Sequence, residues 1–371
     1  MEEPITFTPF VIGRLEIKNR FVKASTAESL ALDTGAVSDD LIRFYTRYAQ
    51  FDLGLIFTGH MYVHPSGKAH PKQTAICGDE FIPGLTRLSE AVHRHGGHIF
   101  AQINHGGSQV RGDVAAPLGP SPVKNPLTGA IPRELGSEEI KTMIAAFGEA
   151  ARRVKEAGFD GVHIHSGHGY LISQFNSPYG NRREDAWGGA PEKRSRFLMR
   201  VVEEVRHQVG PDYPVSVKLG IADAIRDGLK EEEGADLARA LADVGIDAIE
   251  LSCGVMEPTG GSARPVERLE DEAYFLPYAG AVREAVGDLP IILVGGLKTP
   301  ALMERVIQGK SVDFVSLGRS LIREPDFVSQ IGRGRLEPAT CISCNQCIGA
   351  LGQRGLRCYV NEPLTEEEKV P

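Results

Sequence analysis

Two histidines and a tyrosine lie close together near the middle of the chain, in the run His165-Ser166-Gly167-His168-Gly169-Tyr170. Imidazole N–H groups can donate to a substrate oxygen, and a phenol can give a proton to a reacting carbon. Two histidines three residues apart can also share a metal ion, and buried histidines often belong only to a structural hydrogen-bond network. No carboxylate or third ligand lies at metal spacing nearby, so the run favours the donor role over the metal. The structural role stays open.

Three more polar side chains lie inside apolar runs. Gln102 and Asn104 alternate with Ala101 and Ile103, and each either binds a ligand or joins a buried hydrogen-bond network. Lys218 lies in the run Val-Ser-Val-Lys-Leu, where burial of an unpaired charge is costly. Lys218 should therefore face an anion, a developing negative charge, or the carboxylate of a nearby Asp or Glu.

Four of the six cysteines lie near the C-terminus, at Cys341, Cys344, Cys347 and Cys358. The chain begins Met-Glu-Glu-Pro without an apolar leader, so we expect a cytoplasmic protein with reduced thiols. Three closely spaced thiolates and one remote thiolate suit either zinc or an iron–sulfur cluster. The spacing alone leaves both metals open.

The composition is that of a folded protein without membrane or nucleic-acid partners. Hydrophobic residues make up 42% and charged residues 24% of the 371 positions, which is typical of a globular chain. No apolar run approaches the roughly 18 residues that a membrane span needs. The formal net charge of -8 argues against a general nucleic-acid binder.

The candidate residues follow predicted β-strands. Short Val- and Ile-rich runs alternate with amphipathic helical runs that end in glycine, a pattern typical of a parallel sheet. Eight such strands predict an α/β fold, a (β/α)8 TIM barrel, with the active site at the carboxyl ends of the strands. No Gly-x-Gly-x-x-Gly turn follows a strand, which argues against an open Rossmann sheet. The predicted strands are Phe21–Ala24, Leu53–Phe57, His98–Ile103, Gly161–His165, Val215–Leu219, Ala248–Leu251, Ile291–Val294 and Phe314–Leu317.

The last two predicted strands end in Gly295-Gly296 and in Gly318-Arg319. Glycines let backbone N–H groups approach a phosphate, and barrels often bind phosphate after strands seven and eight. Arg319 could add a bidentate charge. The alternative is a tight turn beside a surface cation, and the position in the barrel favours the phosphate site.

Longer motifs link the chain to a known family. They are His165–Ile172, Asn181–Gly189, Arg194–Phe197, Ile12-Gly13 with Lys18–Phe21, Gln102–Gly107 and Ser316–Arg319. In these motifs, from about Phe7 to Pro363, the chain resembles the old yellow enzyme family of FMN-dependent ene-reductases. Within that family it is most similar to the FMN/[4Fe-4S] barrel domain of 2,4-dienoyl-CoA reductase and trimethylamine dehydrogenase.

The resemblance implies a role for each matching residue. His165 and His168 would bind the carbonyl oxygen of the substrate, and Tyr170 would protonate the carbon alpha to it. Gln102 would contact the pyrimidine edge of the flavin, and Lys218 the N1/C2 end. The loop Ala24, Ser25, Thr26 and Ala27 would pass along the ring together with Gly59 and His60, and Gly295, Gly296, Gly318 and Arg319 would hold the phosphate. The cysteines at 341, 344, 347 and 358 would bind a [4Fe-4S] cluster, with zinc as the alternative.

The resemblance also implies the division of the chain and its activity. We expect an FMN-binding barrel over residues 1–335 and a cysteine segment over residues 336–371 packed on it. The expected reaction is reduction of activated C=C bonds of α,β-unsaturated carbonyl compounds by hydride transfer from flavin N5. The electrons would come from NADH, NADPH or a separate donor protein. The alternatives are an amine or N-demethylating flavin dehydrogenase and an electron-transfer subunit of a larger complex, and a homo-oligomer stays open.

Three departures from the relatives limit what the resemblance implies. The relatives continue into a second nucleotide-binding domain, whereas this chain ends after the cysteines, so an electron source in cis is not expected. Ala27 stands where many members have Thr or Cys. The run Cys253–Met256 offers no match for a histidine that assists protonation in the dienoyl reductase.

Overall fold

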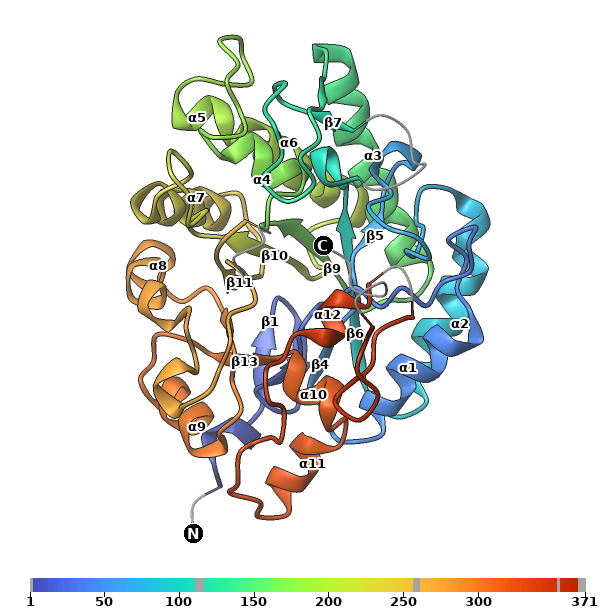
Figure 1. Ribbon diagram of the computed structural model, residues 1–371, viewed down its shortest axis with the longest axis vertical. Helices are drawn as coiled ribbons and strands as arrows, with labels where there is room; N and C mark the ends of the chain where they lie inside the picture. The colour runs from blue at the N-terminus through green and yellow to red at the C-terminus, as the bar shows by residue number, and fades with distance from the viewer. Residues whose placement is uncertain (1–2, 111–116, 256–260, 352–353, 366–371) are drawn as a thin grey trace.

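The computed structural model describes residues 3–110, 117–255, 261–351 and 354–365 (Figure 1). Eight parallel strands pair in a ring that closes because β4 pairs with both β3 and β6. This arrangement confirms the (β/α)8 barrel, and each predicted strand is present with ends shifted by at most two residues. The barrel strands are β3 (Phe21–Lys23), β4 (Leu55–Phe57), β6 (His98–Asn104), β9 (Gly161–Ser166), β10 (Val215–Gly220), β11 (Ala248–Ser252), β12 (Ile291–Val294) and β13 (Phe314–Leu317).

Helices follow the strands and surround the barrel (Figure 1). The principal helices are α1 (Asp39–Ala49), α2 (Ile82–His93), α3 (Ser137–Glu156), α6 (Arg196–Val209), α7 (Glu231–Asp243), α8 (Ala279–Val286) and α9 (Pro300–Gln308). Shorter helices are α4 (Leu171–Asn176), α5 (Pro191–Arg194), α10 (Arg319–Arg323), α11 (Phe327–Gly332) and α12 (Gln346–Gly349). None of the helices in the described ranges is both long and apolar enough to cross a membrane.

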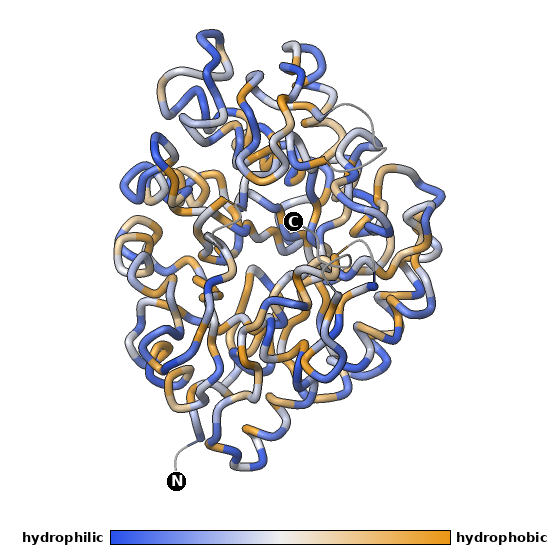
Figure 2. The backbone as a smooth tube through the Cα atoms, in the orientation of Figure 1, coloured by the Kyte–Doolittle hydropathy of each residue, from blue (hydrophilic) through white to orange (hydrophobic). Residues whose placement is uncertain are grey.

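Small strands complete the architecture. The hairpin β1 (Phe10–Ile12) and β2 (Leu15–Ile17) packs its apolar side chains against residues inside the barrel. Strand β5 (Met61–Tyr62) extends the sheet beside β6, and β7 (Leu118–Gly119) pairs with β8 (Arg133–Glu134) outside the ring. Figure 2 shows apolar stretches concentrated along the strands and the inner helix faces.

Strand alternation divides the interior of the barrel into two regions. Toward the amino ends of the strands the inward residues are apolar, and they pack with the β1–β2 hairpin: Val22, Leu55, Phe57, Phe100, Ala248, Ile292 and Phe314. Two residues further along β6, β11 and β13, the inward positions become polar and buried, at Gln102, Glu250 and Ser316. Strands β9 and β10 add the buried polar residues His163, His165 and Lys218, which pair in register with this group. Because side chains alternate with a period of two, the polar positions share one end of the barrel.

Lys23 is an unusual charged side chain in the layer between the barrel and α1, where it is 1% exposed. Its Nζ donates to the carbonyl oxygen of Ala24 at 2.9 Å and to Thr26 Oγ1 at 3.0 Å. Burial lowers the pKa of Lys23 to about 7, against the opposing effect of the Glu28 carboxylate. Three rings of α1 surround the ammonium with their centroids 5.5–5.6 Å away: Phe44, Tyr45 and Tyr48.

The lowered pKa of Lys23 predicts how stability depends on pH. Below pH 7 Lys23 is charged in both states, and the folded protein bears the full free-energy cost of burying that charge. Between pH 7 and the ordinary lysine pKa of 10.5, the folded chain has lost this proton while the unfolded chain still holds it. This group therefore raises the free energy of unfolding with pH, by at most about 1.4 kcal/mol per unit. Lys23→Met should lack this rise when denaturant unfolding is compared with the wild type from pH 7 to 9.5.

A matched control is Lys18→Met, which removes a partly exposed lysine paired with Asp52 and should keep the wild-type slope. Identical pH profiles for the wild type and Lys23→Met would mean that the buried ammonium keeps its proton throughout this range.

Candidate active site

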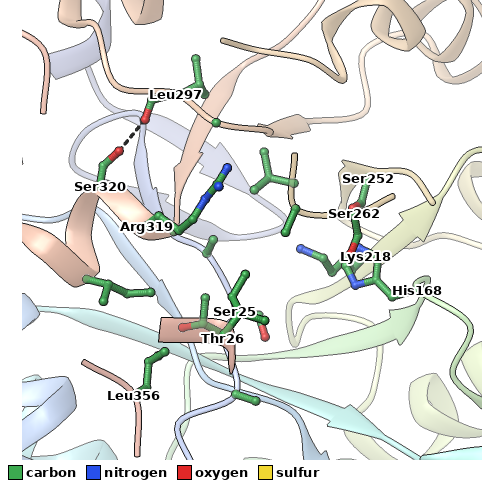
Figure 3. A pocket seen from close by; sticks show the side chains of 18 of the residues that line it. Ser25, Thr26, His168, Lys218, Ser252, Ser262, Leu297, Arg319, Ser320 and Leu356 are labelled. Carbon is green, nitrogen blue, oxygen red and sulfur yellow. Dashed lines mark hydrogen bonds between the residues drawn. The ribbon is translucent and has the colours of Figure 1, made fainter. Parts of the chain in front are cut away.

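The carboxyl ends of the strands enclose a cavity of about 200 Å³ (Figure 3). Most residues predicted to bind FMN or substrate line this one cavity: Ala24, Ser25, Thr26, Ala27, His60, Gln102, His165, His168, Tyr170, Lys218, Gly296, Gly318 and Arg319. Further residues that the sequence motifs did not indicate also line the cavity, among them Ser252, Ser262, Tyr274, Leu297, Lys298, Ser320 and Leu356. Most of these lie in loops, where no periodic pattern marks them.

His165, His168 and Tyr170 form one side of the cavity. The His165 ring centroid lies 5.1 Å from that of His168 and 4.9 Å from that of Tyr170. His168 adopts a left-handed backbone with φ 58°, and its Nε2 lies 2.7 Å from the Ser252 hydroxyl. The sequence run thus brings two imidazoles and a phenol together, as the donor role requires.

Burial keeps both imidazoles neutral. It lowers the pKa of His165 well below the ordinary value and that of His168 to about 3, with the Lys218 charge acting in the same direction. His165 Nδ1 is buried and has no hydrogen-bond partner among the described residues. Among all the residues that the structure describes, no three His, Cys, Asp or Glu side chains are gathered closely enough to hold one metal ion. The two histidines therefore lack a third ligand there, and they fit a role as neutral donors.

Gln102 and Asn104 have different roles although they share a strand face. Gln102 Oε1 accepts from the Ser25 hydroxyl at 2.5 Å, while its buried Nε2 has no partner among the described residues. An amide N–H2 group in that position can donate to a ligand carbonyl, such as one on a flavin pyrimidine. Asn104 is not among the lining residues, and its Nδ2 lies 3.0 Å from His60 Nδ1.

Lys218 lines the cavity and is also paired with a buried carboxylate. Its Nζ lies 2.7 Å from Glu250 Oε2, and the Glu250 side chain is fully buried. His163 Nε2 lies 3.1 Å from the same oxygen, and the Ser316 hydroxyl donates to Oε1 at 2.7 Å. Burial alone would raise the pKa of Glu250, but Lys218 and His163 hold it below its usual range. Lys218 therefore forms an ion pair with a buried carboxylate, which was one of the predicted alternatives, and its ammonium group lies at the cavity wall.

Glu250 was missed as a functional residue. It lies in Ala248-Ile249-Glu250-Leu251-Ser252, where a polar residue between two apolar ones looks like ordinary strand alternation. The available signal was its position: Glu250 pairs in register with Lys218 on the neighbouring strand. Opposite charges directly across a buried parallel pair predict an ion pair inside the barrel.

The opposite end of the cavity is basic. The Arg319 guanidinium donates to Asn345 Oδ1 and to the carbonyl oxygen of Arg264, both at 2.8 Å, and neither acceptor is charged. Lys298 also lines the cavity. Gly296 has φ 71°, and a Cβ there would come within 2.5 Å of Val266. This end combines positive charge with a backbone that only glycine permits, which suits a phosphate group.

Two predicted glycines do not line the cavity. Gly59 N donates to Glu28 Oε1 and to the Tyr45 hydroxyl, both at 2.7 Å, so its backbone faces the layer outside the barrel. Gly295 lies against Phe275 and Tyr274, with φ 140°. Both glycines support the strand ends from outside the cavity.

The four C-terminal cysteines are free thiols, and among the described residues no three of them are gathered closely enough to hold one metal ion. Cys341 lines the cavity, Cys347 is buried and Cys344 is exposed. Burial, together with the other three thiols, raises the pKa of Cys347 to about 12. Arg323 donates to Cys358 Sγ at 3.7 Å.

Hydrogen bonds tie the cysteine segment to the barrel. Asn345 Nδ2 donates to the carbonyl oxygen of Ala263 at 2.9 Å, and Leu356 N donates to that of Glu28 at 2.7 Å. In Figure 1 this segment, drawn in red, crosses in front of the barrel. Leu356 also lines the cavity, so the segment forms part of its wall.

Comparisons with known proteins agree with this architecture. The chain is 37% identical to NADH oxidase of Thermoanaerobacter brockii over 99% of its length and 57% of the relative. It is 32% identical to cinnamate reductase of Clostridium sporogenes over 98% of its length and 58% of that relative. The chain therefore spans less than two thirds of either relative.

A solved structure gives the same fold. The old yellow enzyme homologue from Zymomonas mobilis superposes with a TM-score of 0.77 at 26% identity, covering 92% of this chain and 96% of that one. These likenesses confirm the resemblance drawn from the sequence motifs. The matching family model describes flavin oxidoreductases, the class of enzyme that the resemblance implied. Since that model matches residues 6–337, the chain belongs to the NADH:flavin oxidoreductase / NADH oxidase family.

Proposed function

We propose that this protein is an FMN-dependent oxidoreductase that reduces the activated C=C bond of α,β-unsaturated carbonyl compounds. The observation that carries the proposal is the wall formed by His165, His168 and Tyr170, with two neutral donors and a phenol facing one cavity. Cinnamate reductase, to which the chain is similar, is named for a substrate of this chemical class.

The cavity offers groups that fit FMN along its whole length. The Gln102 amide has an N–H2 group without a partner among the described residues, and Arg319 and Lys298 supply positive charge to the cavity. The loop Ala24 to Ala27 also lines the cavity, and Lys23 holds it by a hydrogen bond from Nζ to Thr26 Oγ1. When bound, FMN would supply the hydride that is transferred to the substrate. NADH, NADPH or a separate protein is the proposed source of electrons.

The residues of this chain would handle the charge and the proton. As hydride reaches the β-carbon, negative charge develops on the carbonyl oxygen, and fixed donors stabilise it most in a site shielded from water. Burial keeps His165 and His168 neutral, so each ring has a single N–H that could donate there. Tyr170 would give its phenolic proton to the α-carbon, as a general acid.

We also propose that Cys341, Cys344, Cys347 and Cys358 bind one [4Fe-4S] cluster that admits electrons from a separate protein. Support comes from the donor set, four free thiols of which three act electrostatically on Cys347, and from Cys341, which lines the cavity itself. The four thiols are not gathered into a metal-holding group in this structure, so the cluster would have to draw them together. Thiolate-only ligation suits an iron–sulfur cluster. Zinc is the alternative outcome.

Tyr170→Phe tests the proton donor. The variant should keep its FMN and be reduced by NADPH or dithionite at the wild-type rate. Oxidation of the reduced enzyme by cyclohex-2-enone, followed by stopped flow, should slow by about 10²–10⁴-fold, the usual contribution of a general acid. Tyr179→Phe, whose partly exposed hydroxyl contacts the carbonyl oxygen of Lys124, is the matched control. Wild-type oxidation of Tyr170→Phe would show that another group is the acid.

Charge variants of the Lys218–Glu250 pair test its proximity to the flavin. Lys218→Met leaves the Glu250 carboxylate buried, which should lower both stability, by about 3–5 kcal/mol, and the flavin midpoint potential. Glu250→Gln leaves a lone cation and should raise the potential. The double variant removes both charges and should return toward the wild-type potential in a spectroelectrochemical titration. Equal potentials in all four proteins would make the pair purely structural.

Metal analysis of anaerobically purified protein tests the cluster. About four irons with labile sulfide per chain are expected from the stoichiometry of a [4Fe-4S] site. Cys344→Ala should then lose partner-driven turnover and keep dithionite-driven enone reduction, whereas Cys77→Ala, outside the cysteine segment, should keep both. One zinc per chain would contradict the cluster.

A further inference from the structure

His60 is a buried imidazole beside Tyr170, and the proposed mechanism gives it no role in the chemistry. It is 6% exposed and follows strand β4 into the cavity wall. The ring centroids of His60 and Tyr170 lie 4.9 Å apart, and His60 Nε2 lies 3.4 Å from Tyr170 Oη. Which atom carries the hydrogen in that contact depends on the His60 tautomer.

Gln73 determines the tautomer of His60. The backbone N–H of Ala69 donates to Gln73 Oε1 at 2.7 Å, which fixes the orientation of the amide. Gln73 Nε2 therefore faces His60, 2.8 Å from its carbonyl oxygen and 2.9 Å from its Nδ1. The two amide hydrogens meet these two acceptors, so Nδ1 carries no proton. Asn104 Nδ2 lies 3.0 Å from the same nitrogen.

The remaining ring nitrogen must then hold the proton. Burial, with His70 and His168 nearby, keeps the pKa of His60 well below the ordinary value. The ring is therefore neutral with a single N–H, and that N–H is at Nε2, the atom that faces Tyr170.

We infer that His60 is a positioning residue for the proton donor: its Nε2–H donates to Tyr170 Oη, so that the Tyr170 O–H points elsewhere, toward the cavity. When Tyr170 reacts, the O–H bond breaks, a C–H bond forms at the substrate α-carbon, and the electron pair stays on the phenolate oxygen. The hydrogen bond from His60 strengthens as that charge appears. Water restores the phenolic proton after the product leaves. This inference rests on the proposed role of Tyr170.

The tautomer can be observed directly in the holoenzyme. In the ¹⁵N spectra of protein labelled on histidine, His60 is assigned by the loss of its signals in His60→Phe and by their shift in Tyr170→Phe. A neutral ring protonated at Nε2 from pH 6 to 8 is the expected result. A proton on Nδ1, or a ring that titrates in this range, would overturn the inference without any use of activity.

A double-mutant cycle tests the coupling to Tyr170. His60→Phe keeps a ring but removes the donor, and should slow enone-driven oxidation by roughly 10- to 100-fold, the value of a hydrogen bond to a charged group. In the Tyr170→Phe background the same change should have no further effect. His64→Phe, which removes a half-buried imidazole outside the cavity, is the control. FMN content and the rate of flavin reduction are measured in each variant.

The outcomes separate the two hypotheses. Full activity in Tyr170→Phe would count against the proposed proton donor itself. A slow Tyr170→Phe enzyme with additive losses in the double variant would count against His60 alone, because a purely structural residue does not act through the phenol.

Discussion

The buried Glu250 carboxylate is the interaction on which the polar half of the barrel depends. Three groups from three other strands converge on it: the ammonium of Lys218, the imidazole of His163 and the hydroxyl of Ser316. A carboxylate without exposure is stable only when its partners satisfy it. The register of four strands and the position of Lys218 at the cavity wall therefore depend on one another, and the effects of replacing these side chains should not be additive.

Much of this arrangement could be predicted from the sequence because it follows from two regularities. Strand alternation and glycine-ended helices predicted the eight strands, and the rule that barrels react at the carboxyl ends of strands placed Gln102, His165 and Lys218 together. The role of Glu250 was not predicted because its strand shows the ordinary alternation of polar and apolar residues. Ser262 and Tyr274 were not predicted as lining residues because they lie in loops, whose path is set by tertiary packing. Gly59 was predicted to line the cavity, but its backbone N–H donates instead to the Glu28 carboxylate and the Tyr45 hydroxyl, which lie outside the barrel.

Burial gives the histidines around the cavity a common property. His60, His165 and His168 all have pKa values below the ordinary range, because each ring is shielded from water and lies near other imidazoles or Lys218. Such rings can donate or accept a hydrogen bond but do not supply a proton of their own near neutrality. A phenol beside them is then the group with a proton to give, which makes the two residue types complementary.

The hydrogen bond between Leu356 and Glu28 joins the cysteine segment to the loop that follows the first barrel strand. Cys341 and Leu356 belong to the cavity wall, and they leave the ribosome after every barrel strand has been synthesised. The cavity is therefore completed only by residues that follow all eight barrel strands in the sequence, so an intact barrel alone does not define its full wall.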